Sequence, residues 1–381
     1  MKILLFHKSN ILGGAETLII RTAQMLSNIG YKVIVCVVNG FYNEYISDLD
    51  ILDISLNKYT LECDDIIITF PIYIRSLDRY FEHYDNRVLY WTVHFYNLRN
   101  FYPFISTLQR KSKLVNYFVD KVIFRKRYLR LKKQIKAAIN HKMLFFMDVG
   151  VKNHVLDYYN FMDNMIRYNS ILPIPVSVNK FNSVNFIETT KKITQCKKIR
   201  VGFIGRLDRF KVFPINKVLS DFIKIKEVFR GYEFIFKVIG AGNDKNLIEI
   251  PACLVVDFVG EIEYSKLFDY VKEEIDLVFA MGTTALEAAL CLKPVILLDV
   301  MYNKCDFNYK YRYIYESRGY SLGELVENEN DVFGKHSLLE VIDSVINNYE
   351  EIAVKSNNYV ILNHSEINIT KQLTLIFGDL K

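Results

Sequence analysis

Short apolar runs alternate with amphipathic segments along most of this chain. The first run, residues 2–6, is followed by glycines and by a segment whose apolar positions recur at helical spacing up to a stop at Gly30. Such alternation is typical of βα units built on parallel sheets. The predicted strands fall in residues 2–6, 31–39, 65–70, 88–93, 143–147 and 171–176, and then in 198–205, 232–240, 254–260, 276–282 and 294–299.

Two series of these units predict two domains. A polar stretch without sustained periodicity separates them, and 381 residues are more than one hydrophobic core usually holds. We predict an α/β protein with two Rossmann-like domains facing across a cleft. The predicted parts are a first domain over 1–178, a connector over 179–198, a second domain over 199–350, and a helical tail over 351–381 that could cross back onto the first domain.

Composition indicates a globular protein of a reducing compartment. Half of the residues are hydrophobic and about a quarter are charged. The first apolar run is too short for a signal peptide, and no apolar run approaches the ~18 residues that a membrane span needs. The six cysteines are scattered without C-x-x-C spacing, which disfavours disulfides and metal sites. These features predict a cytoplasmic location.

The positive charge is concentrated in residues 110–142, where twelve Lys and Arg accompany one acid, Asp120. Apolar positions in this segment form two helical faces: Leu114, Phe118 and Val122, and Tyr128, Leu131 and Ile135. A basic amphipathic segment with aromatic residues fits an anionic membrane surface, and Arg125, Lys126 and Arg127 are its candidate contacts. A core-packed helix with a solvated face is an equal alternative. No recognised RNA-binding module occurs, so no nucleic acid is expected.

Ligands of open α/β sheets bind outside the carboxyl ends of the strands, so the residues that follow each predicted strand are the candidates for a site. They are Gly13, Gly14, His94, Arg206, Lys211, Gly240, Gly282, Thr283 and Thr284. Asp64, Asp65 and Asp276 precede their strands, and we expect them at the opposite edge. A histidine such as His94 is more often a buried, hydrogen-bonded residue than a catalytic one. Gly13 and Gly14 also suit a plain tight turn, and the sequence around them is not a dinucleotide fingerprint.

The stretch FAMGTTALEAAL, residues 279–290, combines a glycine turn with a helix start. Amides at Thr283 and Thr284 would form an anion site there, and Glu287, expected in the first turn, could accept from ribose hydroxyls. The alternative is a capping box, with Thr284 as N-cap and Glu287 reaching back to it. Arg206 and Lys211 could neutralise a diphosphate, although solvated loop charges are common for these residue types.

Several kinds of active site are missing from the sequence. It contains no H-E-x-x-H, no clustered Cys and His, no G-x-S-x-G and no P-loop. We therefore expect no metal and no cofactor. Two α/β domains, each with a glycine-rich turn and a helix start at a carboxyl edge, instead predict a cleft for a nucleotide diphosphate.

Five stretches of the chain occur in an order and spacing that one enzyme family shares. They are GGAETLIIRTAQMLSNIGYKVIVCV, VGFIGRLDRFK, VIGAGN, FVGEIEYSKLFDYV and LEAALCLKPVI. With these stretches the chain resembles the GT-B glycosyltransferases, in particular the family 4 type that builds bacterial surface polysaccharides. The resemblance covers most of the chain except the basic region near 110–142.

The resemblance implies a role for each matching residue. Arg206 and Lys211 would bind the donor diphosphate in place of a metal, and Glu287 would bind the ribose. The remaining implied donor contacts are Gly13, Gly14, Gly240, Gly282, Thr283 and Thr284, with Ile262 near the base and His94 near the donor sugar. One position departs from the family pattern, because Phe279 stands where a glutamate usually contacts the donor sugar.

We therefore predict a glycosyltransferase that transfers a hexosyl or N-acetylhexosaminyl group from a nucleotide-diphosphate sugar. A polyprenyl-diphosphate-linked or oligosaccharide acceptor, surface-polysaccharide (O-antigen or capsule) assembly and a peripheral position on the inner face of a bacterial membrane complete the prediction. The resemblance implies retention at the anomeric carbon. Alternatives are a nucleotide-sugar epimerase of the same architecture, and a non-catalytic subunit that binds sugar nucleotides or polysaccharide.

Overall fold

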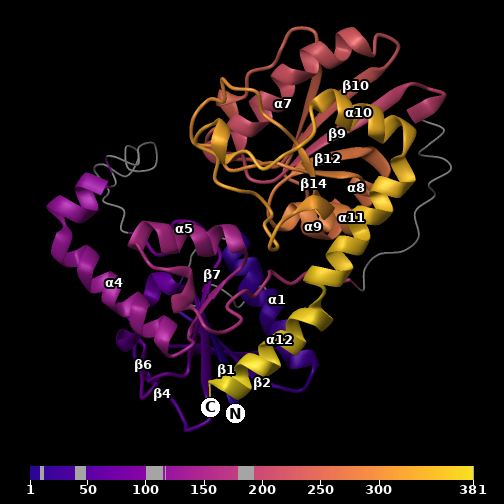
Figure 1. Cartoon of the computed structure of the whole chain (residues 1–381). Coiled ribbons are helices and arrows are strands. Elements are labelled where there is room, and N and C mark those ends of the chain that lie inside the picture. The colour runs from indigo at the N-terminus through magenta and orange to yellow at the C-terminus, as the bar shows by residue number, and fades with distance from the viewer. Residues whose placement is uncertain (9–12, 39–48, 100–114, 116, 179–192, 381) are drawn as a thin grey trace. The chain divides into compact units, whose positions relative to one another are not determined.

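The computed structural model of the protein describes residues 1–8, 13–38, 49–99, 115, 117–178 and 193–380 (Figure 1). Contacts between Cα atoms divide the chain into two compact units. Unit 1 comprises Met1–Pro175 together with Glu366–Lys381, and unit 2 comprises Val176–Ser365. The sequence pattern placed its boundaries at 178, 198 and 350. Most of the predicted connector, residues 179–192, lies outside the described residues.

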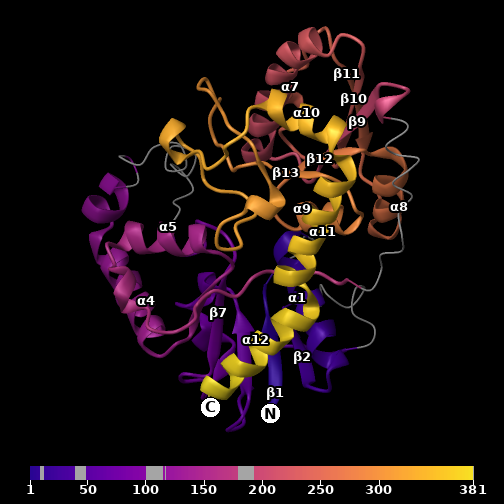
Figure 2. The same cartoon turned by 45° about the vertical axis from the view of Figure 1, so that its right-hand side comes forward.

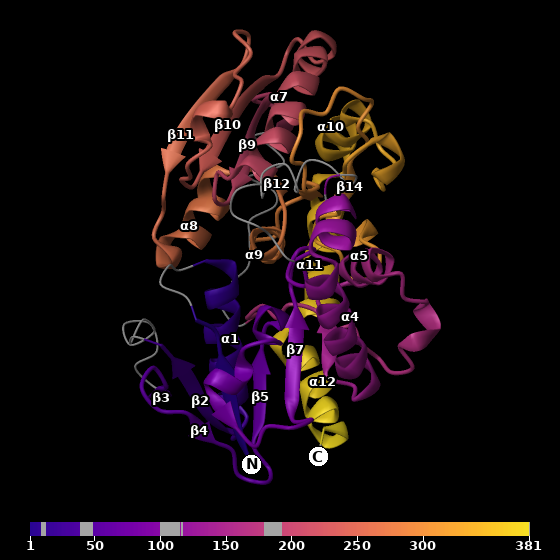
Figure 3. The same cartoon turned by 90° about the vertical axis from the view of Figure 1, so that its left-hand side faces the viewer.

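Unit 1 is built on a six-stranded sheet in the order β3-β2-β1-β5-β7-β8, with every pair of neighbours parallel. Figure 3 shows β2, β5 and β7 of this sheet together with α1. β5 and β7 are buried along their whole length, as expected for strands covered on both faces. The strands are β1 (Lys2–Phe6), β2 (Lys32–Val37), β3 (Asp50–Asp53), β5 (Ile66–Thr69), β7 (Val88–Thr92) and β8 (Leu144–Phe146), with a separate pair β4 (Tyr59–Thr60) and β6 (Phe81–Glu82).

The helices of unit 1 include the C-terminal helix of the chain. α12 packs against α1 (Figure 2). The rings of Tyr31 and Phe377 lie 5.6 Å apart. α12 buries Ile369, Leu373 and Phe377. The helices are α1 (Gly14–Asn28), the π-helix η4 (Phe118–Ile123), α4 (Arg125–Asn140), α5 (Val149–Tyr159) and α12 (Glu366–Asp379), with the 3₁₀ turns η2 (Pro71–Tyr73), η3 (Leu77–Arg79) and η5 (Asp163–Met165).

Unit 2 is built on a second six-stranded sheet, in the order β11-β10-β9-β12-β13-β14. Its neighbours are parallel except that β14 runs antiparallel to β13. The strands are β9 (Lys198–Ile204), β10 (Glu233–Ile239), β11 (Val255–Gly260), β12 (Leu277–Ala280), β13 (Val295–Leu297) and β14 (Arg312–Tyr313). The helices are α7 (Arg209–Val228), α8 (Tyr264–Glu274), α9 (Thr283–Leu290), α10 (Leu338–Asn347) and α11 (Tyr349–His364), with the turns η6 (Lys245–Leu247), η7 (Ile314–Glu316) and η8 (Glu329–Asp331).

Alternation along β9 and β12 separates two cores on the two faces of this sheet. Ile204, Val278 and Ala280 belong to an aliphatic cluster with residues of α8, α9 and α11. The intervening Phe203 and Phe279 belong to an aromatic group with Phe222 of α7, at ring distances of 4.8–6.3 Å between neighbours that include Phe236. Because successive strand residues point to opposite faces, the helices of the two groups cover opposite faces of the sheet.

The predicted tail over 351–381 is divided at Ser365. α11 packs against α9 within unit 2, whereas α12 belongs to unit 1. The predicted strand at 171–176 is wrong, since only isolated bridges form there, at Ile171 and Val176. Pro173 and Pro175 lack the amide hydrogens that a strand needs. Four short strands, β3, β4, β6 and β14, were not predicted.

Candidate functional site

The candidate site in unit 2 lies at the point where the strand order of the sheet reverses. β9 and β12 are neighbours, and the chain proceeds from β9 toward β11 on one side and from β12 toward β14 on the other. Loops leave the carboxyl ends of such a pair in opposite directions and open a crevice in which ligands of this architecture bind. Gly205 and Arg206 follow β9, and Met281 and Gly282 follow β12.

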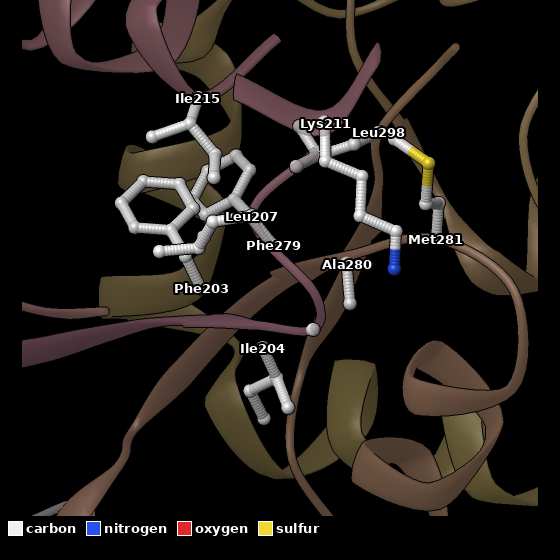
Figure 4. Close-up of a pocket in the computed structure, with 10 residues that line it drawn as sticks. Phe203, Ile204, Leu207, Lys211, Ile215, Phe279, Ala280, Met281 and Leu298 are labelled. Carbon is white, nitrogen blue, oxygen red and sulfur yellow. The ribbon is translucent and has the colours of Figure 1, made fainter. Parts of the chain in front are cut away.

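A small cavity of about 10 Å³ opens at this reversal point, close to the smallest volume that holds one water. The Lys211 side chain, from the first turn of α7, points into the region that Ala280 and Met281 line (Figure 4). The rest of the lining is predominantly apolar: Phe203, Ile204, Gly205, Leu207, Ile215, Phe279 and Leu298.

This environment changes the titration of Lys211. The pKa of the ammonium is lowered from 10.5 to about 8, mainly by burial and also by the positive charge of Arg206, while Asp208 opposes the shift. Within the described residues no carboxylate lies within ion-pair distance of Lys211. The site therefore holds a partly buried cation that is poised to gain from an anionic ligand.

Arg206 differs from Lys211 in exposure and partner. Its side chain is 62% exposed, and its Nε lies 2.6 Å from a carboxylate oxygen of Asp208. The sequence analysis gave a solvated loop charge as the alternative to a diphosphate ligand for both residues. In this structure that description fits Arg206 but not Lys211. An exposed ion pair of this kind contributes little to stability, so the Arg206 guanidinium can exchange Asp208 for a ligand at small cost.

Two glycines let the β9 and β10 loops close around Lys211. Gly205 has φ +140°, and a Cβ there would lie 2.6 Å from Lys211 Nζ. Gly240 has φ +123°, and a Cβ there would lie 2.3 Å from the carbonyl oxygen of Gly205. Gly240 requires glycine for both backbone and packing reasons, whereas Gly205 requires it for its backbone conformation, since the flexible Lys211 side chain could move away. The donor contact expected at Gly240 stays a prediction.

The start of α9 corrects one sequence interpretation. Its N-cap is Gly282, so Thr284 is the second helical residue and the capping box is wrong. The Thr284 hydroxyl lies 3.1 Å from the carbonyl oxygen of Ile204 and 3.0 Å from that of Met281, tying the ends of β9 and β12 together. The Ala285 amide donates to the Gly282 carbonyl, which leaves the amides of Thr283 and Thr284 as the helix-end donors.

Glu287 is the fifth residue of α9 and not part of its first turn as the sequence interpretation had it. It is 7% exposed, and the hydroxyl of Tyr264 donates to its Oε1 at 3.3 Å. Ile262, between β11 and α8, packs against the cluster that contains the inner residues of α9. Glu287, Ile262 and Tyr264 are thus gathered where α8 and α9 meet.

Phe279, which stands where the sequence resemblance implies a glutamate, has a structural role. It lies within β12, is 0% exposed, and its ring centroid is 5.8 Å from that of Phe203 and 6.0 Å from that of Tyr311. The strand points this side chain toward the α7 core beneath the cavity. Sequence spacing identified the departure but did not show that this position is interior.

In unit 1 the strand order reverses between β1 and β5, and the predicted glycines follow β1. Gly13 is the N-cap of α1, and its carbonyl accepts from the amide of Thr17 at 3.0 Å; Gly14 is the first helical residue. His94 follows β7, where its Nδ1 accepts from the amide of Tyr96 at 3.1 Å. The remaining loop residues 9–12 lie outside the described residues.

A buried polar chain at the same edge was missed by the sequence analysis. His7 Nε2 lies 2.9 Å from Glu16 Oε1, and the Tyr73 hydroxyl lies 3.0 Å from His7 Nδ1. His7 directly follows β1 and Tyr73 follows β5, so the rule that selected His94 also selects them. Their contact joins segments 66 positions apart, which no local pattern reveals.

Comparison with solved structures gives the fold. The chain aligns over 99% of its length with all of the Anabaena protein HepE in complex with UDP, at a TM-score of 0.55 and 12% identity. It aligns over its full length with 98% of a glycosyltransferase from Rickettsia africae (TM-score 0.55, 14% identity) and over 99% with all of WaaG, a glycosyltransferase of lipopolysaccharide biosynthesis (0.53, 13%). The chain has the GT-B fold. No family model matches its sequence, and no curated protein matches it either.

On this GT-B chain the basic segment forms an exposed surface in unit 1. Arg125, Lys126 and Arg127 are all exposed. The described part of the segment is not one helix, because η4 ends at Ile123 before α4 begins. Tyr128, Leu131 and Ile135 are buried, so this face of α4 is core-packed. Phe118 and Val122 are more than half exposed, and Leu114 lies outside the described residues.

The described residues contain neither a metal-ligating cluster nor a helix that could cross a membrane. No group of three His, Cys, Asp or Glu side chains there is arranged to hold a metal ion. No helix among those residues combines the length and apolar character that a membrane crossing requires. The expectation of metal-free chemistry stays a prediction.

Proposed function

We propose that this GT-B chain is a glycosyltransferase whose donor is a nucleotide-diphosphate sugar. The observation that carries the proposal is Lys211, a partly buried ammonium at the reversal point of the unit 2 sheet with a pKa lowered to about 8. Burying a charge without a partner is costly, and a diphosphate supplies the partner. The GT-B fold and the UDP bound to HepE support a nucleoside diphosphate as that anion.

In the proposed reaction, negative charge develops beside the positively charged groups of unit 2. Breaking the bond between the anomeric carbon and the diphosphate leaves negative charge on the leaving nucleoside diphosphate. Lys211, Arg206 and the amides of Thr283 and Thr284 lie on the loops that would receive it, and donors fixed beforehand stabilise a developing charge at low reorganisation cost. We propose that this set replaces a divalent metal, with Glu287 on the ribose and Ile262 near the base.

Unit 1 is proposed to supply the acceptor site, further donor contacts at Gly13 and Gly14, and the contact of His94 with the transferred sugar. Gly13, Gly14 and His94 lie on loops at the carboxyl edge of its sheet, which is the ligand-binding edge of this architecture. The resemblance to family 4 favours a retaining transfer to a polyprenyl-diphosphate-linked or saccharide acceptor in surface-polysaccharide assembly. Phe279 supports the second candidate function, a subunit that binds sugar nucleotides without transfer, because the usual sugar-binding carboxylate is replaced.

A transfer assay tests the proposal. The protein is incubated with UDP-, GDP- and ADP-sugars and a polyprenyl-diphosphate-linked monosaccharide, and products are separated by mass. We expect a glycolipid one sugar longer, formed without added metal, and about a hundredfold loss of rate in Lys211→Ala and a smaller loss in Arg206→Ala. The matched control is Lys224→Ala, an exposed lysine of the same helix.

The alternatives give different products. Epimerised free nucleotide sugar would identify an epimerase, and binding without turnover would identify the non-catalytic subunit. Glycolipid formation that is unchanged in both Lys211→Ala and Arg206→Ala would contradict the assigned diphosphate site.

We also propose that unit 1 docks on an anionic membrane, on the cytoplasmic face, where a lipid-linked acceptor resides. The η4–α4 surface consists of Tyr117, Phe118, Val122, Ile123, Arg125, Lys126, Arg127 and Leu129, all exposed. Large apolar side chains beside clustered cations suit a bilayer interface with negative headgroups.

Co-sedimentation with vesicles of phosphatidylglycerol and phosphatidylcholine tests this surface. Reversing Arg125, Lys126 and Arg127 to Glu removes about 3 kcal/mol of attraction at roughly 1 kcal/mol per residue and adds repulsion, so we expect partitioning to weaken by at least about a hundredfold. Lys224→Glu serves as the control. Equal sedimentation of the triple variant and the wild type would remove the membrane proposal and leave the donor site untouched.

A further inference from the structure

Tyr264 is an aromatic residue beside the assigned ribose carboxylate to which no motif gave a role. It is the first residue of α8 and follows Ile262 by two positions. The residue is 47% exposed, although its hydroxyl and its ring both make contacts. The hydroxyl donates to Glu287 Oε1 at 3.3 Å, and the ring stands edge-on to Phe268 with centroids 5.3 Å apart.

These contacts fix the orientation of an exposed ring. Phe268 lies one helical turn farther along α8 and itself packs against the cluster that includes the inner residues of α9. Glu287 belongs to α9 and is 7% exposed, so it offers Tyr264 a rigid partner. An aromatic face that is already ordered before a ligand arrives loses little conformational entropy on binding.

The hydrogen bond between Tyr264 and Glu287 is long. At 3.3 Å it exceeds the 2.7–2.8 Å that is usual between a hydroxyl and an oxygen acceptor, and is therefore weak. A ribose hydroxyl that reaches Glu287 can replace it at small cost. Until then the tyrosine hydroxyl is one hydrogen-bond donor to this buried carboxylate.

The geometry points to Tyr264 as the aromatic wall of the nucleoside subsite. Its ring packs against the base of the donor nucleotide, while its hydroxyl holds the Glu287 carboxylate in place until the ribose takes over that bond. The inference rests on the proposed function, because it requires a nucleoside diphosphate at Glu287. It goes further by assigning base affinity to the ring and not to the hydroxyl of one residue.

Stacking sets the size of the expected effect. Removing an aromatic ring from a stacked base weakens binding by roughly 5- to 150-fold, since such contacts contribute about 1–3 kcal/mol. Every base has an aromatic face, so the wall raises affinity without by itself choosing the base. Selectivity for one base over the others would then depend on the neighbouring Ile262 and the backbone around it.

Titration calorimetry without divalent metal separates the ring from the hydroxyl. The ligands are UDP, GDP and ADP, with inorganic pyrophosphate as the ligand that has neither base nor ribose. We expect Tyr264→Phe to bind the tightest nucleotide within about twofold of the wild type, and Tyr264→Ala to bind it about tenfold more weakly. Pyrophosphate affinity should be equal in all three proteins.

Controls distinguish a local effect from a folding defect. Phe333→Ala removes another aromatic side chain of unit 2 that is 46% exposed, and it should bind nucleotides as the wild type does. Tyr264→Trp keeps an aromatic face and should restore the affinity that Tyr264→Ala loses. Thermal melting of each variant without ligand identifies any that is unfolded.

The outcomes are separable from those of the proposed function. If the wild-type protein binds none of the three nucleotides, both the proposed donor site and the role of Tyr264 are refuted. If the wild type binds a nucleotide and Tyr264→Ala binds it with the same dissociation constant, the role of the Tyr264 ring is refuted and the proposed function is not. Equal losses of nucleotide affinity in Tyr264→Phe and Tyr264→Ala have the same meaning. A loss of pyrophosphate affinity in Tyr264→Ala that matches its loss of nucleotide affinity also refutes the role of the ring.

Discussion

Replacing Lys211 with methionine tests the electrostatics of the unit 2 cavity. Methionine keeps the length and the apolar stem of the side chain but removes its charge. The surroundings are predominantly apolar, with Ala280, Met281 and Leu298 among the lining residues, so the substituted side chain should be accommodated. Two effects of opposite direction are expected, one on the stability of the free protein and one on ligand affinity.

The effect on stability follows from the pKa of Lys211. Burial, reinforced by Arg206, lowers that pKa from 10.5 to about 8, a difference of about 2.5 pH units. At roughly 1.4 kcal/mol per unit the charged lysine costs the folded state about 3 kcal/mol. Because the folded pKa is lower than the unfolded one, this cost is fully present below pH 8 and disappears as the pH rises through 10.5. Lys211→Met should therefore unfold at higher urea concentration at pH 7, by up to about 3 kcal/mol, with a shrinking advantage above pH 8.

The effect on affinity has the opposite sign. A diphosphate pairs with the protonated lysine, so wild-type affinity for the tightest nucleotide should be constant from pH 7 to 7.5 and weaken by up to about tenfold per pH unit above 8. Lys211→Met should bind about a hundredfold more weakly at pH 7 and show no such decline between pH 8 and 9.5. Calorimetry without metal measures both, and Lys224→Met, on the same helix, is the control.

Two results would refute this reasoning. A Lys211→Met protein less stable than the wild type at pH 7 would mean that the ammonium has a favourable partner in the folded state. An equal pH dependence of nucleotide affinity in the wild type and Lys211→Met would mean that another group controls binding.

Two further substitutions test the scaffold around the cavity by urea denaturation. Phe279→Glu, which introduces the residue that the sequence resemblance implies, should lower the free energy of unfolding by at least about 3 kcal/mol because it buries a carboxylate in an aromatic core, whereas Phe279→Leu should cost less; equal costs would contradict the interior position. Asp299→Ala should cost about 3–5 kcal/mol, since Asp299 and Arg312 form a buried bidentate pair at 2.7 and 2.9 Å and the guanidinium would lose its partner; a loss under 1 kcal/mol would contradict that view.

The strands that form the two sheet centres were predictable because each is a continuous apolar run. β1 is apolar after its first residue, Lys2, and β9 is buried nearly throughout, with Arg200 as the one polar residue inside it. β3 begins and ends with exposed aspartates, and β14 is two residues long, so neither has a pattern that differs from a loop. At 171–176 the apolar run is present, but its two prolines prevent the pairing that defines a strand.

The site was predictable as far as strand order determines it. Residues after β9 and β12 must meet if those strands are neighbours, which brought Arg206, Lys211 and Gly282 forward. Burial and local geometry were not accessible in the same way. The sequence did not distinguish Arg206 from Lys211. In the structure the Arg206 side chain is 62% exposed, whereas Lys211 is partly enclosed and has a lowered pKa. The helix start at Thr283 likewise depends on the Gly282 backbone, which excludes the capping box.

The presence of Phe279 where the resemblance implies a glutamate bears directly on Lys211, because both residues line the same cavity. A carboxylate at this position would raise the pKa of the lysine and give it a partner inside the protein. The phenyl ring does the reverse, since it removes water from the ammonium and offers no charge. The substitution thus increases what the site gains from an anionic ligand, even as it removes a hydrogen-bond acceptor for a sugar. A lysine ammonium in this apolar surrounding does not stabilise the core. The Phe279–Lys211 pair therefore favours a site that binds an anion.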